Sequence, residues 1–250
     1  MAGHSKWSSI KHKKGIADKR RGQLFAKLVR EITLAARDGG GDPTMNARLR
    51  LAIEKAGEAN MPKDNIERAI KKGTGELPGV SYIEITYEGY GPSGVAVMVQ
   101  AATDNRNRTA SEIRRIFSEY GGNMGESGCV NWLFHKKGYI VIEKKEITEE
   151  DLLEKLIELD VEDMKTGEDS YEIFTSPENY SEVAKSLKES VVLETSELTM
   201  LPSTTVKLTG KDALSMMKMI DKFEDNDDVQ EVFANFDIPD SEMEKIAEEL

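Results

Sequence analysis

The chain has 250 residues, of which 38% are hydrophobic and 32% are charged, and its formal net charge is −12. This composition is typical of a soluble globular protein, and no apolar run approaches the roughly 20 residues that cross a bilayer. A single cysteine, Cys129, excludes an internal disulfide and zinc sites built from several cysteines.

Positive charge is concentrated at the N-terminal end. Up to Gly75 the chain has 17 lysines and arginines against 8 aspartates and glutamates, a balance of +9, whereas the rest carries −21. A polyanion would therefore be attracted by the first part and repelled by the remainder. Membrane headgroups are the rival polyanion. The start lacks the apolar stretch of a secretory signal, so we expect a cytoplasmic protein, with an organelle transit peptide as the alternative.

Residues 1–76 are predicted to form a basic domain of three helices. Apolar residues from Phe25 to Ile32 recur at helical spacing, and this helix should end near Gly39–Gly41. A second helix is expected with Asp42 as N-cap and Pro43 at its first position. A third should open at Asp64 and end at Gly73, with basic residues on its polar side. Those residues are Arg68, Lys71 and Lys72.

In the next segment the residue pattern has a period of two, which is typical of strands, at residues 82–87 and 95–100. The loop EGYGPSG separates these two stretches. Gly89, Gly91 and Gly94 make a literal G-x-G-x-x-G. A dinucleotide-binding fingerprint requires a helix after the glycines, but VAVMVQ is strand-like, so a hairpin turn is predicted.

A helix from about Thr109 to Tyr120 should follow, with Thr109 and Glu112 spaced as a capping box. A short strand is expected around Val130–Phe134.

Residues 136–202 have the order strand, helix, strand, strand, helix, strand, which is the ferredoxin-like βαββαβ arrangement. The remaining segment contains a helix around Met216–Phe223 and the strand VQEVFANF. We expect these elements to complete the sheet of the preceding domain. The predicted fold class is therefore α+β: a three-helix bundle followed by two ferredoxin-like domains. Residues 77–135 plus 203–250 form one of them, and residues 136–202 are inserted in it.

The sequence offers little for catalysis. Its three histidines are His4, His12 and His135, and the first two lie among lysines. Cys129 and His135 lie on or beside one predicted strand, roughly 20 Å apart if extended, too far for a nucleophile and its base. No enzyme activity, metal or cofactor is expected.

Nucleic-acid binding has better support. The first thirty residues contain nine lysines and arginines and one acid, Asp18, whereas an ordinary solvated surface mixes signs. Trp7 could stack on a base or pack against the bundle. Arg106 and Arg108 enter a helix whose N-terminal amides favour phosphate, although helix capping also explains their polar neighbours. The candidate nucleic-acid-binding residues are His4, Lys6, Trp7, Lys11, His12, Lys13, Lys14, Lys19, Arg20, Arg21, Lys27, Arg30, Arg106 and Arg108.

Several stretches closely resemble the YebC family of bacterial and organellar proteins. They include MAGHSKWSSIKHKK, RGQLFAKLVREI, GGGDPTMNARLRLAIEKA, NMPKDNIERAIKKG, YEGYGPSGVA, DNRNRTASEIR and LPST, and they span nearly the whole chain. The resemblance implies a helical N-terminal domain followed by two α+β domains. It also implies a DNA-binding transcriptional regulator, the description of most members, whereas others act with ribosomes in translation. It implies no enzyme activity and no cofactor.

The residues alone do not choose the polymer. No helix is rich in the Asn, Gln and Arg side chains that read base edges in the major groove. Duplex DNA and ribosomal RNA present the same phosphates. Two functions therefore remain: a transcriptional regulator that binds DNA, and a ribosome-associated translation factor that binds rRNA.

Overall fold

The computed structural model describes residues 18–249, and the side chains of this range except those at 18–20, 240, 244 and 247–249. The described chain divides into two compact units. One contains residues 18–129 and 211–232, and the other contains residues 130–210 and 233–249. No helix of the described residues has the length and hydrophobicity to cross a membrane.

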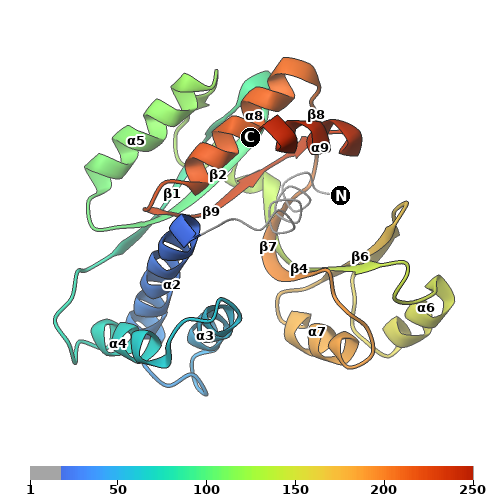
Figure 1. Cartoon of the computed structure of the whole chain (residues 1–250), viewed down its shortest axis with the longest axis horizontal. Helices are drawn as coiled ribbons and strands as arrows, with labels where there is room; N and C mark the ends of the chain where they lie inside the picture. The colour runs from blue at the N-terminus through green and yellow to red at the C-terminus, as the bar shows by residue number, and fades with distance from the viewer. Residues whose placement is uncertain (1–17, 250) are drawn as a thin grey trace. The chain divides into compact units, whose positions relative to one another are not determined.

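The first unit begins with three helices, α2 (Asp18–Gly39), α3 (Ala47–Glu58) and α4 (Lys63–Gly73). The long helix α2 packs on both others, and small or aliphatic side chains such as Ile32, Leu49 and Ala69 fill the space between them. Figure 1 shows α3 and α4 on either side of the C-terminal part of α2. The predicted three-helix region is confirmed.

The start of α3 differs from the prediction. Its N-cap is Asn46, whose side-chain oxygen accepts a 3.0 Å hydrogen bond from the backbone N–H of Leu49. The Asn46 amide also donates to the carbonyls of Ala35 and Gly40, at 2.8 Å each. Asp42 instead accepts from Thr44 within the preceding turn, so Asp42 and Pro43 do not open the helix. The Asp42 carboxylate therefore stabilises a turn and does not cap the helix. Aspartate commonly accepts such hydrogen bonds in turns.

The same unit contains a four-stranded sheet in the order β3-β1-β2-β9. Its strands are β3 (Asn123–Met124), β1 (Ile83–Tyr90), β2 (Ala96–Thr103) and β9 (Val229–Ala234). Two helices, α5 (Arg106–Glu119) and α8 (Gly210–Glu224), pack side by side on it, with the Phe117 and Phe223 rings 4.9 Å apart (Figure 1). Because β9 joins this sheet, the chain returns to it after the second unit, as predicted.

The glycine motif forms the predicted hairpin turn between β1 and β2. A short 3-10 turn, η1 (Pro92–Gly94), connects the strands, and both Ser93 and Gly94 have positive φ. Gly89 is needed for close packing, because a Cβ there would lie 2.8 Å from the Phe117 ring. The motif is therefore a structural element of the hairpin, and a strand rather than a helix follows it.

The second unit contains β4 (Phe134–Glu143), α6 (Glu149–Ile157), β5 (Asp163–Thr166), β6 (Ser170–Thr175), α7 (Tyr180–Lys188) and β7 (Thr195–Pro202). These strands form an antiparallel sheet in the order β5-β6-β4-β7, which is the ferredoxin-like order. Apolar side chains of both helices and of the strands, such as Ile140, Leu152 and Val183, make its core. The α+β fold class is confirmed; the predicted domain boundaries remain a prediction.

Several local expectations were wrong. Residues Asn131–Leu133 form a 3-10 turn, η2, in place of a strand, and β4 begins only at Phe134. Helix α5 begins at Arg106, and its N-cap is Asn105, four residues before the predicted cap Thr109. The last strand of the predicted ferredoxin-like series lies at Thr195–Pro202.

The small elements β3, β8 (Val206–Lys207), β10 (Phe236–Asp237) and helix α9 (Asp240–Glu249) complete the described chain. The strands β8 and β10 pair in parallel as a two-stranded sheet.

Candidate nucleic-acid interface

The predicted basic residues fall into three groups. His4, Lys6, Trp7, Lys11, His12, Lys13 and Lys14 lie outside the described residues. Lys19 and Arg20 are in the first turn of α2, and their side chains also lie outside the description. The remaining five, Arg21, Lys27, Arg30, Arg106 and Arg108, have described side chains.

Three of these five, Arg21, Arg106 and Arg108, are exposed to solvent, and within the described residues the first two form no ion pair. Arg21 lies on α2 with its guanidinium 5.6 Å from the centroid of the Phe25 ring. Arg106 is the first residue of α5, and its backbone carbonyl accepts a hydrogen bond from the Tyr87 hydroxyl. Both guanidinium groups can reach a phosphate without a rearrangement of the backbone.

Lys27, a residue of α2, is half-buried against the C-terminal end of α8. Its Nζ donates a 2.6 Å hydrogen bond to the carbonyl of Glu224, the last residue of that helix. One turn earlier on α2, Gln23 donates to the carbonyl of Asp225 at 3.3 Å. A cation at this position satisfies an unpaired carbonyl and the negative end of the helix dipole. Burial lowers the pKa of Lys27, and the nearby carboxylates of Glu224, Asp225 and Asp227 partly offset this effect.

Arg30 lies one turn further along α2 and is also largely buried. Its Nη2 is 3.6 Å from a carboxylate oxygen of Asp228, and its guanidinium lies 5.5 Å from the centroid of the Tyr82 ring. Its Nη1 atom is buried and has no hydrogen-bond partner among the described residues. Arg30 therefore has its charge balanced but one donor unsatisfied, a costly arrangement for a buried group.

Asp228 is the centre of this arrangement, with only 6% of its side chain exposed. Its carboxylate accepts hydrogen bonds from Arg108 Nη2 at 2.7 Å, Thr109 Oγ1 at 2.7 Å and Thr103 Oγ1 at 3.1 Å. Burial alone would raise the pKa of Asp228, but these three donors lower it below the ordinary value. Asp228 thus links the end of β2, the first turn of α5 and helix α2.

Arg108 is divided between two carboxylates. Besides Asp228 it contacts Asp104 at 2.9 Å. The pKa of the guanidinium is raised, most by its hydrogen bond to Asp228 and next by its hydrogen bond to Asp104. Arg106 and Arg108 occupy the same helix turn and are both exposed, but within the described residues only Arg108 forms ion pairs, with the exposed Asp104 and the buried Asp228.

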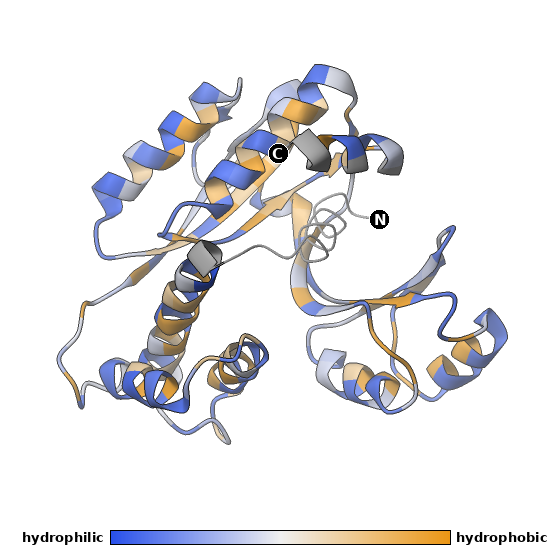
Figure 2. Cartoon of the chain, in the orientation of Figure 1, coloured by the Kyte–Doolittle hydropathy of each residue, from blue (hydrophilic) through white to orange (hydrophobic). Residues whose placement is uncertain are grey.

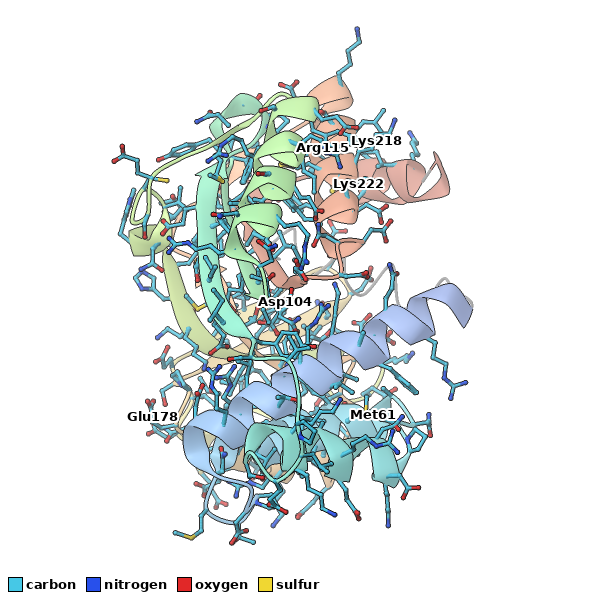
Figure 3. The ribbon with its side chains drawn as sticks, turned by 90° about the vertical axis from the view of Figure 1, so that its left-hand side faces the viewer. Met61, Asp104, Arg115, Glu178, Lys218 and Lys222 are labelled. Atoms are coloured by element: carbon cyan, nitrogen blue, oxygen red, sulfur yellow. The ribbon has the colours of Figure 1, made fainter. Side chains whose placement is uncertain are left out.

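These contacts surround a polar hollow of about 590 Å³ between α2, α5, α8 and the segment Glu224–Asp228, which we call the acidic loop. Figure 3 shows Arg115 of α5 close to Lys222 of α8, and Asp104 near the first turn of α5. The hollow has mixed charge. Its cations are Arg30, Arg108, Arg115 and Lys222, and its acids are Asp104, Glu112, Asp225, Asp227 and Asp228.

A second basic surface lies on α4, and we call Arg68, Lys71 and Lys72 the α4 cations. All three are exposed, and within the described residues none of them forms an ion pair. Much of α4 is hydrophilic in Figure 2, while Ala69 on its other side is buried. The helical spacing in the sequence identified this basic side, but the list of candidate binding residues did not include it.

The environment of the single cysteine, Cys129, disfavours its thiolate form. Burial raises the pKa of the Cys129 thiol, and the negative charge of Glu88 adds to this effect. A thiol with a raised pKa is a poor nucleophile at neutral pH. Within the described chain, no three His, Cys, Asp or Glu side chains come together as a possible metal site.

The fold and the exposed cations define the class: an α+β protein whose helical N-terminal region carries exposed basic side chains. Residues 5–76 match the family model "TACO1/YebC protein N-terminal domain", and residues 82–236 match "TACO1/YebC second and third domain". The chain belongs to the YebC family.

Similar proteins align with almost the whole chain. A "Probable transcriptional regulatory protein" of Geobacter sulfurreducens is 57% identical over 98% of this chain and 100% of its own length. One of the same description from Dictyoglomus turgidum is 53% identical, over 99% of this chain and 100% of its own. The crystal structure of a conserved hypothetical protein from Aquifex aeolicus has 52% identity and a TM-score of 0.77, covering 89% of this chain and 93% of that one.

Proposed function

We propose that this chain is a non-enzymatic, nucleic-acid-binding regulator of transcription that acts in the cytoplasm by neutralising phosphates. The observation that carries the proposal is the one-sided charge of the first 75 residues, +9 in a chain whose net charge is −12. The relatives described as probable transcriptional regulatory proteins support the transcriptional role.

The phosphate contacts are proposed to come from two places. One is the basic N-terminal segment with Lys6, Lys11, Lys13 and Lys14, continued by Arg21 on α2. The other is the α4 cations, which the structure leaves exposed. Cations on a flat helical surface contact the backbone of the polymer and not base edges, so this mode of binding gives affinity and position with little sequence selection.

The acidic remainder of the molecule has a complementary role in this proposal. The second unit contains 10 lysines and arginines against 24 aspartates and glutamates, so it repels a phosphate polymer. Nucleic acid would therefore contact the basic segments of the chain, and the acidic unit would remain available to other partners.

The bound polymer can be identified by crosslinking in cells followed by sequencing of the nucleic acid recovered with the tagged full-length chain. The proposal predicts recovery of chromosomal DNA at discrete regions, and the recovery should fall when Lys6, Lys11, Lys13 and Lys14 are replaced by glutamine. Recovery of ribosomal RNA without DNA would overturn the transcriptional role and favour the translation alternative, because the same phosphate contacts serve either polymer.

A further inference from the structure

The acidic loop, Glu224–Asp228, lies against basic side chains of two helices, α2 and α5. It contacts Lys27 through the Glu224 carbonyl at 2.6 Å, and its Asp228 carboxylate lies 3.6 Å from Arg30 and 2.7 Å from Arg108. Four of its five residues are acidic. The loop thus places a row of negative groups where three predicted phosphate-binding side chains gather.

We propose that the acidic loop is a built-in competitor of nucleic acid: its outer carboxylates, Asp225 and Asp227, follow the Glu224 carbonyl that binds Lys27 and line the same hollow as Arg30, and a phosphate backbone must displace them to reach these two cations. This inference rests on the proposed function, since it concerns regulation of the same basic surface. It distinguishes two populations of cations, those available at all times and those available only in competition with the loop.

The loop is built from parts with different strengths of attachment. Asp228 is buried and accepts three hydrogen bonds, so it remains in place. Asp225 and Asp227 are exposed, and within the described structure neither side chain forms a hydrogen bond or an ion pair. They act on Lys27 by charge alone, through attraction that raises its pKa against the effect of burial. Such exposed charges are the part of the loop that a polyanion can displace.

The unsatisfied donor of Arg30 supports the competition. Within the part of the chain that the structure describes, Arg30 Nη1 is buried without an acceptor, even though the Asp228 carboxylate balances the charge. A phosphate oxygen is a strong acceptor that pairs with guanidinium in two-point geometry. The closed arrangement therefore leaves a bond that nucleic acid can complete and the loop does not.

The loop lines the polar hollow, which gives a phosphate room to approach. The hollow opens between the loop and the α5–α8 pair, and Arg115 and Lys222 contribute further positive charge to its wall. Mixed charge explains why the hollow is not a permanent anion site: its five carboxylates oppose an anion until the outer ones move.

The test compares two double variants of the full-length chain that each remove two acidic charges from the first unit. Asp225→Asn with Asp227→Asn neutralises the outer loop. Glu54→Gln with Glu58→Gln neutralises two exposed acids of α3 that also make no ion pair in the described structure. Affinity is measured for a fluorescein-labelled random-sequence DNA duplex at fixed salt, because like charges at an interface strongly oppose binding. We expect the loop variant to bind about tenfold more tightly and the α3 variant to stay within about twofold of the unmodified chain.

A second measurement follows Lys27 directly. The rate of Lys27 acetylation by acetic anhydride is read by mass spectrometry with and without saturating duplex, with the exposed Lys185 of α7 as internal control. We expect bound duplex to slow acetylation of Lys27 and to leave Lys185 unchanged.

The outcomes separate the two proposals. Equal tightening by both double variants, or unchanged acetylation of Lys27 with duplex bound, would overturn the competitor role while the proposed function stands. Absence of duplex binding by the unmodified chain and by both variants at low salt would overturn DNA binding itself. In that case, the same two measurements with a ribosomal RNA fragment decide whether the loop competes with RNA.

Discussion

The cations near the acidic loop and the α4 cations look alike in the sequence but differ in the folded protein. Lys27, Arg30 and Arg108 contact the backbone carbonyl of Glu224 or the carboxylate of Asp228. Arg68, Lys71 and Lys72 are exposed and form no ion pair within the described residues. Net positive charge in a segment therefore does not measure the charge that a phosphate polymer can reach. The fold determines which cations are paired with groups of the protein itself and which, among the described residues, are not.

The largest effect that this comparison predicts is on stability. Replacement of Asp228 by Asn removes the buried charge that Arg108 and Arg30 share, and leaving the largely buried Arg30 without its partner should lower the free energy of unfolding by about 3 kcal/mol. Urea denaturation of the full chain measures it. Asp227→Asn, at the exposed neighbouring position, is the control and should change stability by less than about 0.5 kcal/mol. Equal effects of the two changes would show that Asp228 is not a stabilising centre.

The stability that Asp228 contributes should depend on pH, because the pKa of this residue is shifted. The pKa of Asp228 is lowered in the folded protein, so its stabilising contribution is present above the unfolded value near 3.9 and is lost as the pH falls through the folded pKa. We expect the stability difference between the unmodified chain and the Asp228→Asn variant to be constant near neutral pH and to shrink below about pH 4. Chemical denaturation at a series of pH values tests this, and a difference that grows on acidification would contradict it.

The α4 cations should matter for binding and not for stability. Changing Arg68, Lys71 and Lys72 together to Gln removes three phosphate contacts, so the slope of log affinity against log salt for a DNA duplex should become less negative by about 2.7. Lys27→Gln is the matched comparison, because Lys27 is half-buried against the end of α8 and should change the slope by less than about 1. Fluorescence anisotropy at several salt concentrations gives both slopes. Identical slopes for the triple variant and the unmodified chain would remove α4 from the interface.

The smallest effect is expected at an ion pair that is exposed to solvent, unlike the carboxylate of Asp228. Arg115 and Glu119 are exposed partners one turn apart on α5, with a 2.9 Å separation. Exposed pairs of this kind contribute about 0.3–0.5 kcal/mol. Glu119→Gln should therefore lower the free energy of unfolding by no more than about 0.5 kcal/mol, and a loss comparable to that of Asp228→Asn would contradict the distinction between buried and exposed carboxylates.

The sequence predicted elements whose signals are periodic. The helices around Phe25–Ile32 and Met216–Phe223, the β1–β2 hairpin and the ferredoxin-like order all follow from apolar spacing and turn residues. The short strand β3 carries only two residues, too few for a period to be visible, and helix α9 was likewise not predicted. Caps were misplaced at Asp42 and Thr109, because several residues near each helix start could serve as cap and only the folded chain chooses among them.

The candidate site shows a similar division. Local composition identified the basic segments, and the motif DNRNRT identified the arginines at the start of α5. It could not show that Asp228, more than a hundred residues away in the chain, would bind Arg108, Thr109 and Thr103. The acidic run EDNDD was visible as letters, but its position opposite Lys27 depends on the return of the chain to the first sheet.

The most direct test of the central claim is the salt dependence of duplex DNA binding by the full chain and by a variant with Lys6, Lys11, Lys13 and Lys14 changed to Gln. A control variant changes four lysines of the second unit, Lys155, Lys185, Lys188 and Lys207, and so has the same net charge. We predict that the N-terminal variant loses affinity and that its slope becomes less negative by about 3.6, while the control keeps the slope of the unmodified chain. Equal affinity and slope in the N-terminal variant and the unmodified chain would contradict the claim that the basic end grips the phosphate backbone.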